Sequence, residues 1–298
     1  MQNNLISIII INYRQKTFLV NCINSIYENI KSYPFEIVII NNSQEDYISL
    51  TEYENLTVVL NENKGFSRAN NLGVKHSLGE YLLFLNADTI VKNDFAGELI
   101  NHFENIEFGA VGLKLLNTDG TFQISSYEKN TFTGEIRNKK LENKFSQRNI
   151  PFINKIEAGL KNITKIEWVS GAALFMKRKI FDDIGGFNEK YFLFYEDADI
   201  CKRLSDKGLS SYFYPFSEII HLKGENVNRE FETKTYYFSK LSQLLYYKLH
   251  NNLFDRIILR IYLFSKFLLL SLFTFKKINI EILKLVIGIK NDKSTRTY

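Results

Sequence analysis

The chain has 298 residues, of which 45% are hydrophobic and 24% are charged, and its formal net charge is +5. This length allows a large hydrophobic core in one catalytic domain with an appendage. The two cysteines, Cys22 and Cys201, lie in helical patterns and are expected to be reduced, buried thiols without metal-ligand spacing. Basic and aromatic residues form no recognisable nucleic-acid module, so we expect no nucleic acid as a partner.

Four short apolar runs alternate with helical patterns near the amino terminus: 5–11, 36–40, 57–60 and 81–85. They contain isoleucine, valine and leucine without polar alternation, which is typical of strands buried on both faces of a parallel sheet. Helical spacing in the segments 19–30 and 67–78 predicts helices between these strands, and the alternation predicts an α/β fold. No basic region precedes the first run, which predicts a strand rather than a signal peptide.

Polar side chains follow each of the four runs at the point where it ends: Asn12 and Tyr13, then Asn41, Asn42 and Ser43, then Asn61, Asn63 and Gly65, and finally Asn86 and Asp88. Ligands bind outside the carboxyl ends of the strands in open parallel sheets, so these residues predict one shared pocket. The alternative is that asparagine, abundant throughout the chain, only marks turns. Dinucleotide and P-loop glycine motifs are absent from the sequence.

Asp88 is the carboxylate among these strand-end residues. One carboxylate together with diphosphate oxygens can hold Mg²⁺ or Mn²⁺, because such ions keep several waters and borrow phosphate ligands. A structural turn aspartate is the alternative.

A second acidic group follows the aromatic run 191–195 and consists of Glu196, Asp197 and Asp199. A carboxylate that an apolar segment carries to a helix start is partly desolvated, which can make it a base near neutral pH. Alternatively, these acids only stabilise the first turn of a helix through its dipole.

Seven segments, in this order, resemble glycosyltransferase family 2, and within it the rhamnosyltransferase-type branch that assembles bacterial surface polysaccharides: SIIIINY, VIINNS, NENKGFSRANNLG, YLLFLNAD, WVSGAALF, GGFNEKYFLFYEDADICKRL and EIIHLKG. The resemblance covers roughly residues 5 to 250. It implies a GT-A fold, a nucleotide-sugar donor, a divalent cation (Mn²⁺ or Mg²⁺) and inversion at the anomeric carbon.

The resemblance also implies roles for individual residues. Asp197 matches the general base and Glu196 a supporting acid, while Asp88 and His221 match metal-binding positions. Trp168 is predicted to form an acceptor-side wall, with a core tryptophan as the alternative. The residues that match the donor-binding positions are Asn12, Tyr13, Asn41, Asn63, Gly65, Phe66, Arg68, Asn71, Asn86 and Ala87.

Two of these donor-binding positions depart from the pattern of the family. Asn41 replaces an aspartate that commonly receives the pyrimidine N3–H, and an amide oxygen can still accept that bond. Asn86 replaces the first acid of a DxD motif, which leaves the strictness of metal dependence open.

The chain is predicted to divide into a GT-A catalytic domain over 1–230 and a helical, membrane-associating segment over 231–298. Within the domain, a donor-binding half covers about 1–120 and an acceptor half about 121–230. Residues 137–148 are expected to be a polar, basic loop, either a mobile acceptor-side element or simply solvated.

The carboxyl-terminal segment carries 12 lysines and arginines against 4 acidic residues, a net charge of +8. From 253 to 277 the charged residues Asp255, Arg256, Arg260 and Lys266 share an arc of roughly 140°. Its longest uncharged run, 267–275, is short for a bilayer span. We expect an amphipathic helix on an anionic membrane surface, or else a helix docked on the domain or a partner subunit. The opposite arc consists of Phe254, Ile257, Ile258, Ile261, Phe264, Leu268, Leu272 and Phe275.

The resemblance implies an inverting glycosyltransferase that uses dTDP-rhamnose or a UDP-sugar. Its acceptor would be a hydroxyl of a lipid-linked saccharide or an oligosaccharide in O-antigen, capsule or cell-wall synthesis. The expected location is cytoplasmic, peripheral on the inner face of the bacterial plasma membrane, and a homo-oligomer is left open. An inactive membrane-associated scaffold is the alternative. A processive synthase would need a QxxRW motif and a nucleotidyltransferase a GxGxR loop, and the sequence contains neither.

Overall fold

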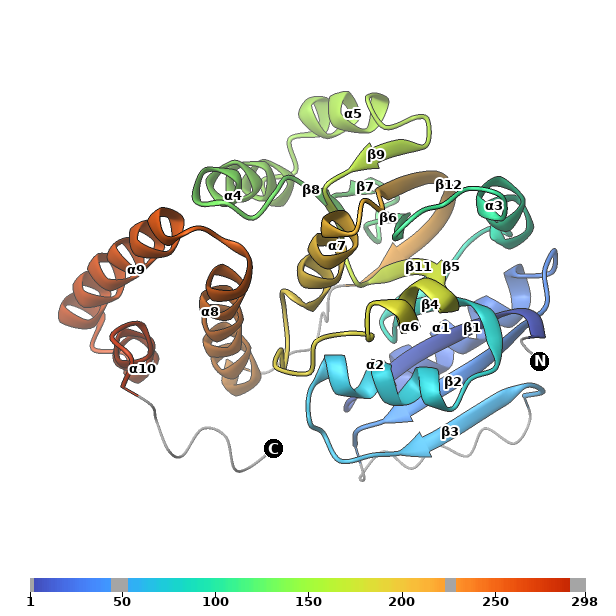
Figure 1. Cartoon of the computed structure of the whole chain (residues 1–298), viewed down its shortest axis with the longest axis horizontal. Helices are drawn as coiled ribbons and strands as arrows, with labels where there is room; N and C mark the ends of the chain where they lie inside the picture. Colours follow the sequence, from blue (N-terminus) through green and yellow to red (C-terminus); the bar gives the residue numbers. More distant parts are fainter. Residues whose placement is uncertain (1–2, 44–52, 223–228, 290–298) are drawn as a thin grey trace.

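Parallel strands that alternate with helices form the amino-terminal half of a computed structural model, which describes residues 3–43, 53–222 and 229–289 (Figure 1). Their order is β1 (Asn3–Asn12), α1 (Lys16–Asn29), β2 (Phe35–Asn41), β3 (Leu56–Leu60), α2 (Phe66–Lys75) and β4 (Gly79–Asn86). The pairs β1–β2, β1–β4 and β2–β3 are all parallel. The predicted strands, helices and α/β class are therefore confirmed.

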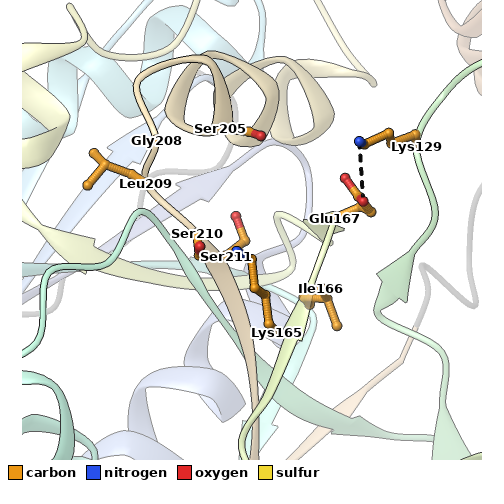
Figure 2. Close-up of a pocket in the computed structure, with 9 residues that line it drawn as sticks. All are labelled: Lys129, Lys165, Ile166, Glu167, Ser205, Gly208, Leu209, Ser210 and Ser211. Atoms are coloured by element: carbon orange, nitrogen blue, oxygen red, sulfur yellow. Dashed lines mark ion pairs between the residues drawn. The ribbon is translucent and has the colours of Figure 1, made fainter.

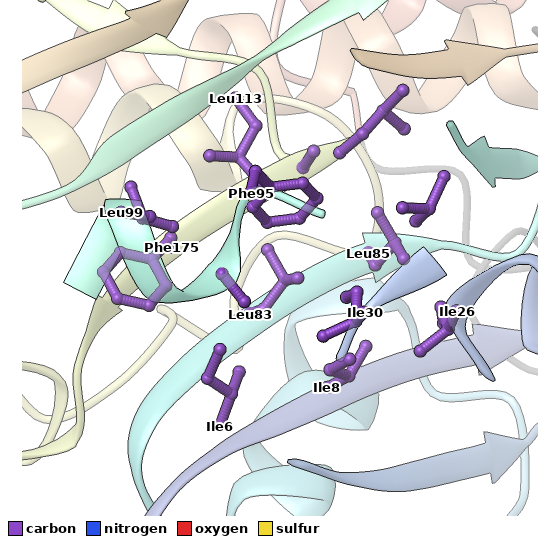
Figure 3. Close-up of a cluster of buried hydrophobic side chains, with 14 of the residues drawn as sticks. Ile6, Ile8, Ile26, Ile30, Leu83, Leu85, Phe95, Leu99, Leu113 and Phe175 are labelled. Carbon is purple, nitrogen blue, oxygen red and sulfur yellow. The ribbon is translucent and has the colours of Figure 1, made fainter. Parts of the chain in front are cut away.

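Both faces of this sheet are covered, which explains why the apolar runs lack polar alternation. Successive side chains of a strand point to opposite faces. Ile8 and Leu83 pack in a core with residues of α1 and of α3 (Ala96–Phe103), as Figure 3 shows. Ile9 and Phe84 pack on the other face with residues of α2 and of α6 (Arg178–Asp183).

Strand β3 departs from the prediction of burial on both faces. It is the first strand in the order of the sheet and therefore an edge strand. Its residues are exposed or half-buried, and Leu60 is 65% exposed. The prediction is wrong for this strand because an edge strand is covered less than a central one.

The carboxyl-terminal half of the sheet is mixed rather than parallel. β11 (Ala173–Lys177) runs antiparallel between β4 and β6 (Val111–Leu116). β12 (Ser211–His221) pairs parallel with β6 and antiparallel with β5 (Thr89–Val91). The shorter strands are β7 (Phe122–Gln123) on β6, β9 (Thr164–Ile166) on β12, and the separate pair β8 (Ser126–Tyr127) and β10 (Trp168–Val169).

The segment predicted to be a loop over 137–148 lies instead in α4 (Phe132–Ser146), which α5 (Ile150–Ala158) follows. The Thr131 hydroxyl caps α4 by accepting a hydrogen bond from the Gly134 N–H at 3.1 Å. The hydrophobic periodicity of α4 is weak because a charged residue, Glu135, lies on the side that faces the protein. Glu135 accepts hydrogen bonds there from Tyr195 and Gln243. The loop prediction is therefore wrong.

Three helices form the carboxyl-terminal part of the described chain: α8 (Arg229–His250), α9 (Leu253–Thr274) and α10 (Lys277–Val286). α8 packs on the sheet domain, where Phe238 stacks on Phe192 with ring centroids 4.5 Å apart. The Ser242 hydroxyl donates to the Leu193 carbonyl at 2.8 Å. Residues 290–298 lie outside the described residues, and the domain boundary near 230 stays a prediction.

A buried carboxylate joins α8 to α7 (Glu196–Asp206). Asp199 is fully buried and contacts Arg203 Nε at 2.8 Å and His250 Nε2 at 2.7 Å. Arg203 also donates to the carbonyls of Ile184 and Gly186. Burial alone would raise the pKa of Asp199, but the hydrogen bond from His250 and the charge of Arg203 outweigh it and lower that pKa.

We expect Asp199→Asn to lower the free energy of unfolding by about 3–5 kcal/mol, because it leaves the arginine of a buried pair without its counter-charge. Since the pKa of Asp199 is lowered, this stabilisation is present above the ordinary carboxyl pKa and is lost as the pH falls through the lowered value. Urea unfolding at neutral pH measures the loss.

Asp206→Asn on the same helix is the matched control, because Asp206 pairs with Lys202 at an exposed i,i+4 position. It should cost no more than about 0.5 kcal/mol. Equal losses for the two variants would contradict the structural role of Asp199.

Candidate active site

The carboxyl ends of β1, β2 and β4 bring three asparagines together. Asn12 is in register with Asn41, and Ile11 with Asn86. The Asn12 amide donates to Asn41 Oδ1 at 2.9 Å, and the same oxygen accepts the Ser43 N–H at 3.1 Å. An amide oxygen has two lone pairs. Asn41 can therefore accept a pyrimidine N–H through this oxygen only if the Asn12–Asn41 pair rearranges.

The segment after β3 packs against the segment that precedes the acidic cluster. Asn63 Oδ1 accepts the Gly65 N–H at 3.2 Å. Gly65 has φ +102°, and a Cβ there would lie 2.7 Å from the Phe192 carbonyl oxygen, so only glycine fits. The Phe66 N–H donates to that oxygen at 2.7 Å. Beside Asn12, the guanidinium of Arg14 lies 5.4 Å from the ring centre of Tyr13.

Arg68 and Asn71 contact protein groups that the sequence did not indicate. Arg68 Nε lies 2.8 Å from Glu189 Oε2. The Asn71 amide donates to the Phe187 carbonyl at 2.9 Å and accepts the Phe187 N–H at 2.9 Å. These contacts hold the 187–189 segment against α2, and the proposed contact of Arg68 and Asn71 with a donor stays a prediction.

Asp88 and His221 face each other, although they are far apart in the sequence. His221 Nδ1 lies 2.8 Å from Gln123 Oε1, and because an amide oxygen only accepts, Nδ1 carries the proton. In the neutral tautomer that carries this proton, Nε2 has a free lone pair. Nε2 lies 3.4 Å from Asp88 Oδ1 and 3.3 Å from the Asn86 amide nitrogen. A histidine that binds a metal through one ring nitrogen typically donates a hydrogen bond from the other ring nitrogen to a protein acceptor. Ala87, which lies between Asn86 and Asp88 in the sequence, is buried.

This donor set fits a divalent cation. Two protein ligands, a carboxylate oxygen and an imidazole nitrogen, present lone pairs to the same region. No group of three or more His, Cys, Asp or Glu side chains that could hold a metal occurs among the described residues. A cation here would therefore need ligands from water or from a substrate, as Mg²⁺ and Mn²⁺ often take.

The acidic cluster begins α7 directly after two strained residues. Phe194 and Tyr195 have positive φ values of 68° and 66°, which are rare for bulky side chains and are typical of functional sites. The Tyr195 hydroxyl donates to Glu135 Oε1 at 2.7 Å and so holds this turn against α4. The turn fixes where Glu196 and Asp197 begin the helix.

Asp197 is held in one orientation. Its Oδ2 accepts the Gly171 N–H at 3.0 Å and its Oδ1 the Ala198 N–H at 2.8 Å. Burial raises the pKa of Asp197 above its ordinary value, and these two N–H groups only partly oppose the rise.

Glu196 has a different environment. It is buried, and its Oε2 accepts no hydrogen bond from the residues that the structure describes. Burial, followed by the charge of Asp197, raises its pKa well above the ordinary value. The pair therefore favours a protonated Glu196 beside an ionised Asp197. All three acids lie in the first turn of α7, as the alternative interpretation also expects. The carboxylate of Asp199 pairs with Arg203 and His250.

Trp168 lies beside this cluster and is half-buried. Its ring stacks on Tyr127 with centroids 4.3 Å apart, and its N–H donates to the Glu128 carbonyl at 2.8 Å. It also packs against two apolar clusters. The charge of Asp197 contributes to a raised pKa of Tyr127, after burial and Glu142. Tyr127 is therefore a neighbour of the acid that the sequence did not single out.

Two cavities differ in their position relative to these residues. One of about 350 Å³ is lined by Gln123, Tyr127 and Glu142 and adjoins the His221 network. Another of about 520 Å³ lies around Ser211, at the end of β12 away from His221, with the Lys129–Glu167 ion pair at its edge (Figure 2). The first belongs to the candidate site and the second does not.

Comparisons with known proteins identify the family of the chain. A family model described as glycosyl transferase family 2 matches residues 7–184, more than half of the chain. A second, described as the N-terminal domain of galactosyltransferase, matches residues 161–225.

Two curated relatives show moderate identity. The low-salt glycan biosynthesis hexosyltransferase Agl10 of Haloferax volcanii is 24% identical over 203 residues, which cover 66% of this chain and 61% of that protein. The rhamnosyltransferase WbbL of Escherichia coli K12 is 25% identical over 264 residues, which cover 74% of this chain and 97% of that protein.

A solved structure supports the fold. The mannosyltransferase PcManGT from Pyrobaculum calidifontis, crystallised with GDP-Man and Mn²⁺, has a TM-score of 0.53 and 14% identity. The match covers 97% of this chain and 87% of that chain, and it agrees with the predicted GT-A fold. The family match shows that the chain is a glycosyltransferase and belongs to glycosyltransferase family 2.

Proposed function

We propose that this glycosyltransferase inverts the anomeric carbon as it moves a sugar from dTDP-rhamnose or a UDP-sugar to an acceptor hydroxyl. The acceptor is a lipid-linked saccharide or oligosaccharide of a bacterial surface polysaccharide. The observation that carries the proposal is the Asp197 carboxylate, desolvated enough to have a raised pKa and fixed by the Gly171 and Ala198 N–H groups. The relative named as a rhamnosyltransferase supports the donor class.

In the proposed reaction, Asp197 accepts the proton of the acceptor hydroxyl. The acceptor oxygen attacks the anomeric carbon from the face opposite the nucleoside diphosphate, whose bond to that carbon breaks as the new bond forms. No covalent intermediate with the protein is needed. Glu196 stays protonated and so keeps a second negative charge away from the base. Trp168 and Tyr127 form one wall of the acceptor side.

Asp88 and His221 would hold Mn²⁺ or Mg²⁺ on the diphosphate of the donor. When bound, such a cation neutralises the charge of the leaving diphosphate. The facing lone pairs of Asp88 Oδ1 and His221 Nε2 support this assignment, and so does the Mn²⁺ in the PcManGT crystal. Asn12, Tyr13, Asn63 and Gly65 line the same edge and are assigned to the nucleotide.

The outer face of α9 supports a membrane-surface location. Seven residues of its predicted apolar arc are exposed, including Leu272 at 59% and Phe275 at 82%. The polar arc turns toward the protein, where Arg260 donates to the Val286 carbonyl at 2.6 Å. By length and composition alone, α9 could also cross a membrane. We favour a location on the membrane surface because protein covers one side of α9. In addition, the carboxyl-terminal segment 231–298 carries a net charge of +8.

Asp197→Asn should lower kcat for sugar transfer by about 10²–10⁴-fold, because the base that accepts the hydroxyl proton is lost. The dissociation constant for nucleoside diphosphate should stay unchanged, since Asp197 acts on the acceptor. In the wild type, activity should fall at low pH with a midpoint above about 4, the ordinary aspartate value. Transfer of radiolabelled sugar over a pH series measures kcat and the midpoint, and titration with nucleoside diphosphate measures the dissociation constant.

Asp206→Asn on the same helix serves again as the control and should keep full activity, because its partner Lys202 faces solvent with it. An unchanged kcat for Asp197→Asn, or an acid midpoint at the ordinary aspartate value, would refute the role of Asp197.

The variant Leu268→Glu/Leu272→Glu should lose binding to vesicles that contain phosphatidylglycerol. Each leucine that enters the membrane contributes about 1.5–3 kcal/mol. Leu60→Glu on β3 is the control, because Leu60 is about as exposed as Leu272 but lies on another element. Co-sedimentation with vesicles measures the binding. If the double variant sediments like the wild type, α9 is not the membrane contact.

A further inference from the structure

The turn that leads into α7 has a backbone conformation that its own residues disfavour. Phe194 and Tyr195 have φ values of 68° and 66°, and neither is a glycine. Strain of this kind persists only where the surrounding structure fixes the backbone. Tyr195 is the residue that caps α7, and its carbonyl accepts the Asp199 N–H at 2.8 Å. A displacement of Tyr195 would therefore displace the first turn of the helix, which contains Asp197.

Glu135 of α4 contacts this turn and α8 at the same time. One carboxyl oxygen, Oε1, accepts the Tyr195 hydroxyl at 2.7 Å, and the other, Oε2, accepts the Gln243 amide of α8. The orientation of that amide is fixed, because its oxygen accepts from Lys240 Nζ at 2.9 Å and an ammonium group can only donate. The Glu135 carboxyl group thus joins the turn to two helices.

α8 also contacts the residues that precede the turn. The ring of Phe238 stacks on that of Phe192 with centroids 4.5 Å apart, and the Ser242 hydroxyl donates to the Leu193 carbonyl at 2.8 Å. Positions 238 and 242 are four residues apart, so these contacts come from one face of the helix. This face of α8 therefore packs along the segment that leads to the start of α7.

We propose that Glu135 and Gln243 are positioning residues, which hold the Tyr195 turn and through it place Asp197 for proton transfer. The role assigns α8 to the support of the active site, in addition to its connection with the membrane-facing helix α9. Both side chains act through Tyr195 rather than on a substrate. The inference rests on the proposed function, because it needs Asp197 to be the base.

Tyr195→Phe removes one oxygen atom and is the mildest test. It should lower kcat about 10–100-fold, because a misplacement of about 1 Å can cost on the order of 10²-fold. Release of dTDP or UDP from dTDP-rhamnose or UDP-glucose, with water as the acceptor and without vesicles, measures kcat. Tyr33→Phe is the matched control and should keep the wild-type kcat. The Tyr33 hydroxyl donates to Asn4 Oδ1 near the amino-terminal ends of β1 and β2, away from the site.

Two substitutions of Glu135 separate the hydrogen bond from the size of the side chain. Glu135→Leu should lower kcat like Tyr195→Phe, and the double variant should lose no more than either single variant, because both remove the same contact. Glu135→Gln keeps an oxygen that accepts the Tyr195 hydroxyl and should retain most of the wild-type kcat. The dissociation constant for dTDP or UDP should not change in any of them, whereas partial unfolding would weaken nucleotide binding as well.

Gln243→Leu tests the contribution of α8. It should lower kcat about tenfold, because one hydrogen bond to a carboxylate is lost. Binding to phosphatidylglycerol vesicles should be unchanged, which distinguishes support of the active site from membrane location. Asn251→Leu is the control, because the Asn251 amide, just after α8, donates to the Asn130 carbonyl at 2.8 Å instead of contacting the turn. It should keep the wild-type kcat.

An unchanged kcat in Tyr195→Phe or in Gln243→Leu would overturn the proposal. An equal loss in the matched controls, or a loss of nucleotide binding that parallels the loss of kcat, would also overturn it. Asp197→Asn in the same assay separates the two levels of the account. If it keeps the wild-type kcat, the proposed function fails. If it loses kcat while Tyr195→Phe does not, only the positioning role fails.

Discussion

The buried ionised carboxylate of Asp199 is the interaction on which the arrangement of the site depends. An ionised group in the interior is tolerated only when it is paired and hydrogen-bonded. Its partners, Arg203 and His250, come from α7 and from the last residue of α8, and Arg203 also holds the carbonyls of Ile184 and Gly186. One charge thus aligns α7, the helix that presents Asp197, with the end of α8. It also holds the segment that contains Ile184 and Gly186 against α7.

The candidate site has two parts that differ in charge and in burial. At the strand ends, neutral amides pair with one another, as in Asn12 with Asn41, and leave Asp88 as the charged group that His221 faces. At the start of α7, the strained aromatic turn and the buried Glu196 keep Asp197 in a desolvated place. The two proposed roles, cation binding at Asp88 and proton acceptance at Asp197, are thus assigned to separate parts of the site.

The sequence was sufficient for the strands and helices of the parallel half of the sheet and for which residues end those strands, because apolar runs and their alternation with helical patterns are local features. It was not sufficient where partners are distant. The burial predicted for β3 is wrong because edge position depends on the whole sheet. The loop predicted over 137–148 is wrong because Glu135 of α4 meets Tyr195 and Gln243 only in the folded chain. The same reason hid the contacts of Arg68 and Asn71 with the 187–189 segment. The resemblance to a family, rather than periodicity, singled out His221.

The central claim is that Asp88 and His221 form, with the strand ends, a cation-dependent nucleoside diphosphate site. Melting temperature in the presence of dTDP, UDP or GDP, each with and without Mn²⁺, tests it most directly, since a ligand that binds the folded state raises that temperature by mass action. The account predicts a rise with dTDP or UDP that requires Mn²⁺ and disappears in Asp88→Ala. No rise with any nucleotide, or a rise that Asp88→Ala retains in full, would contradict it.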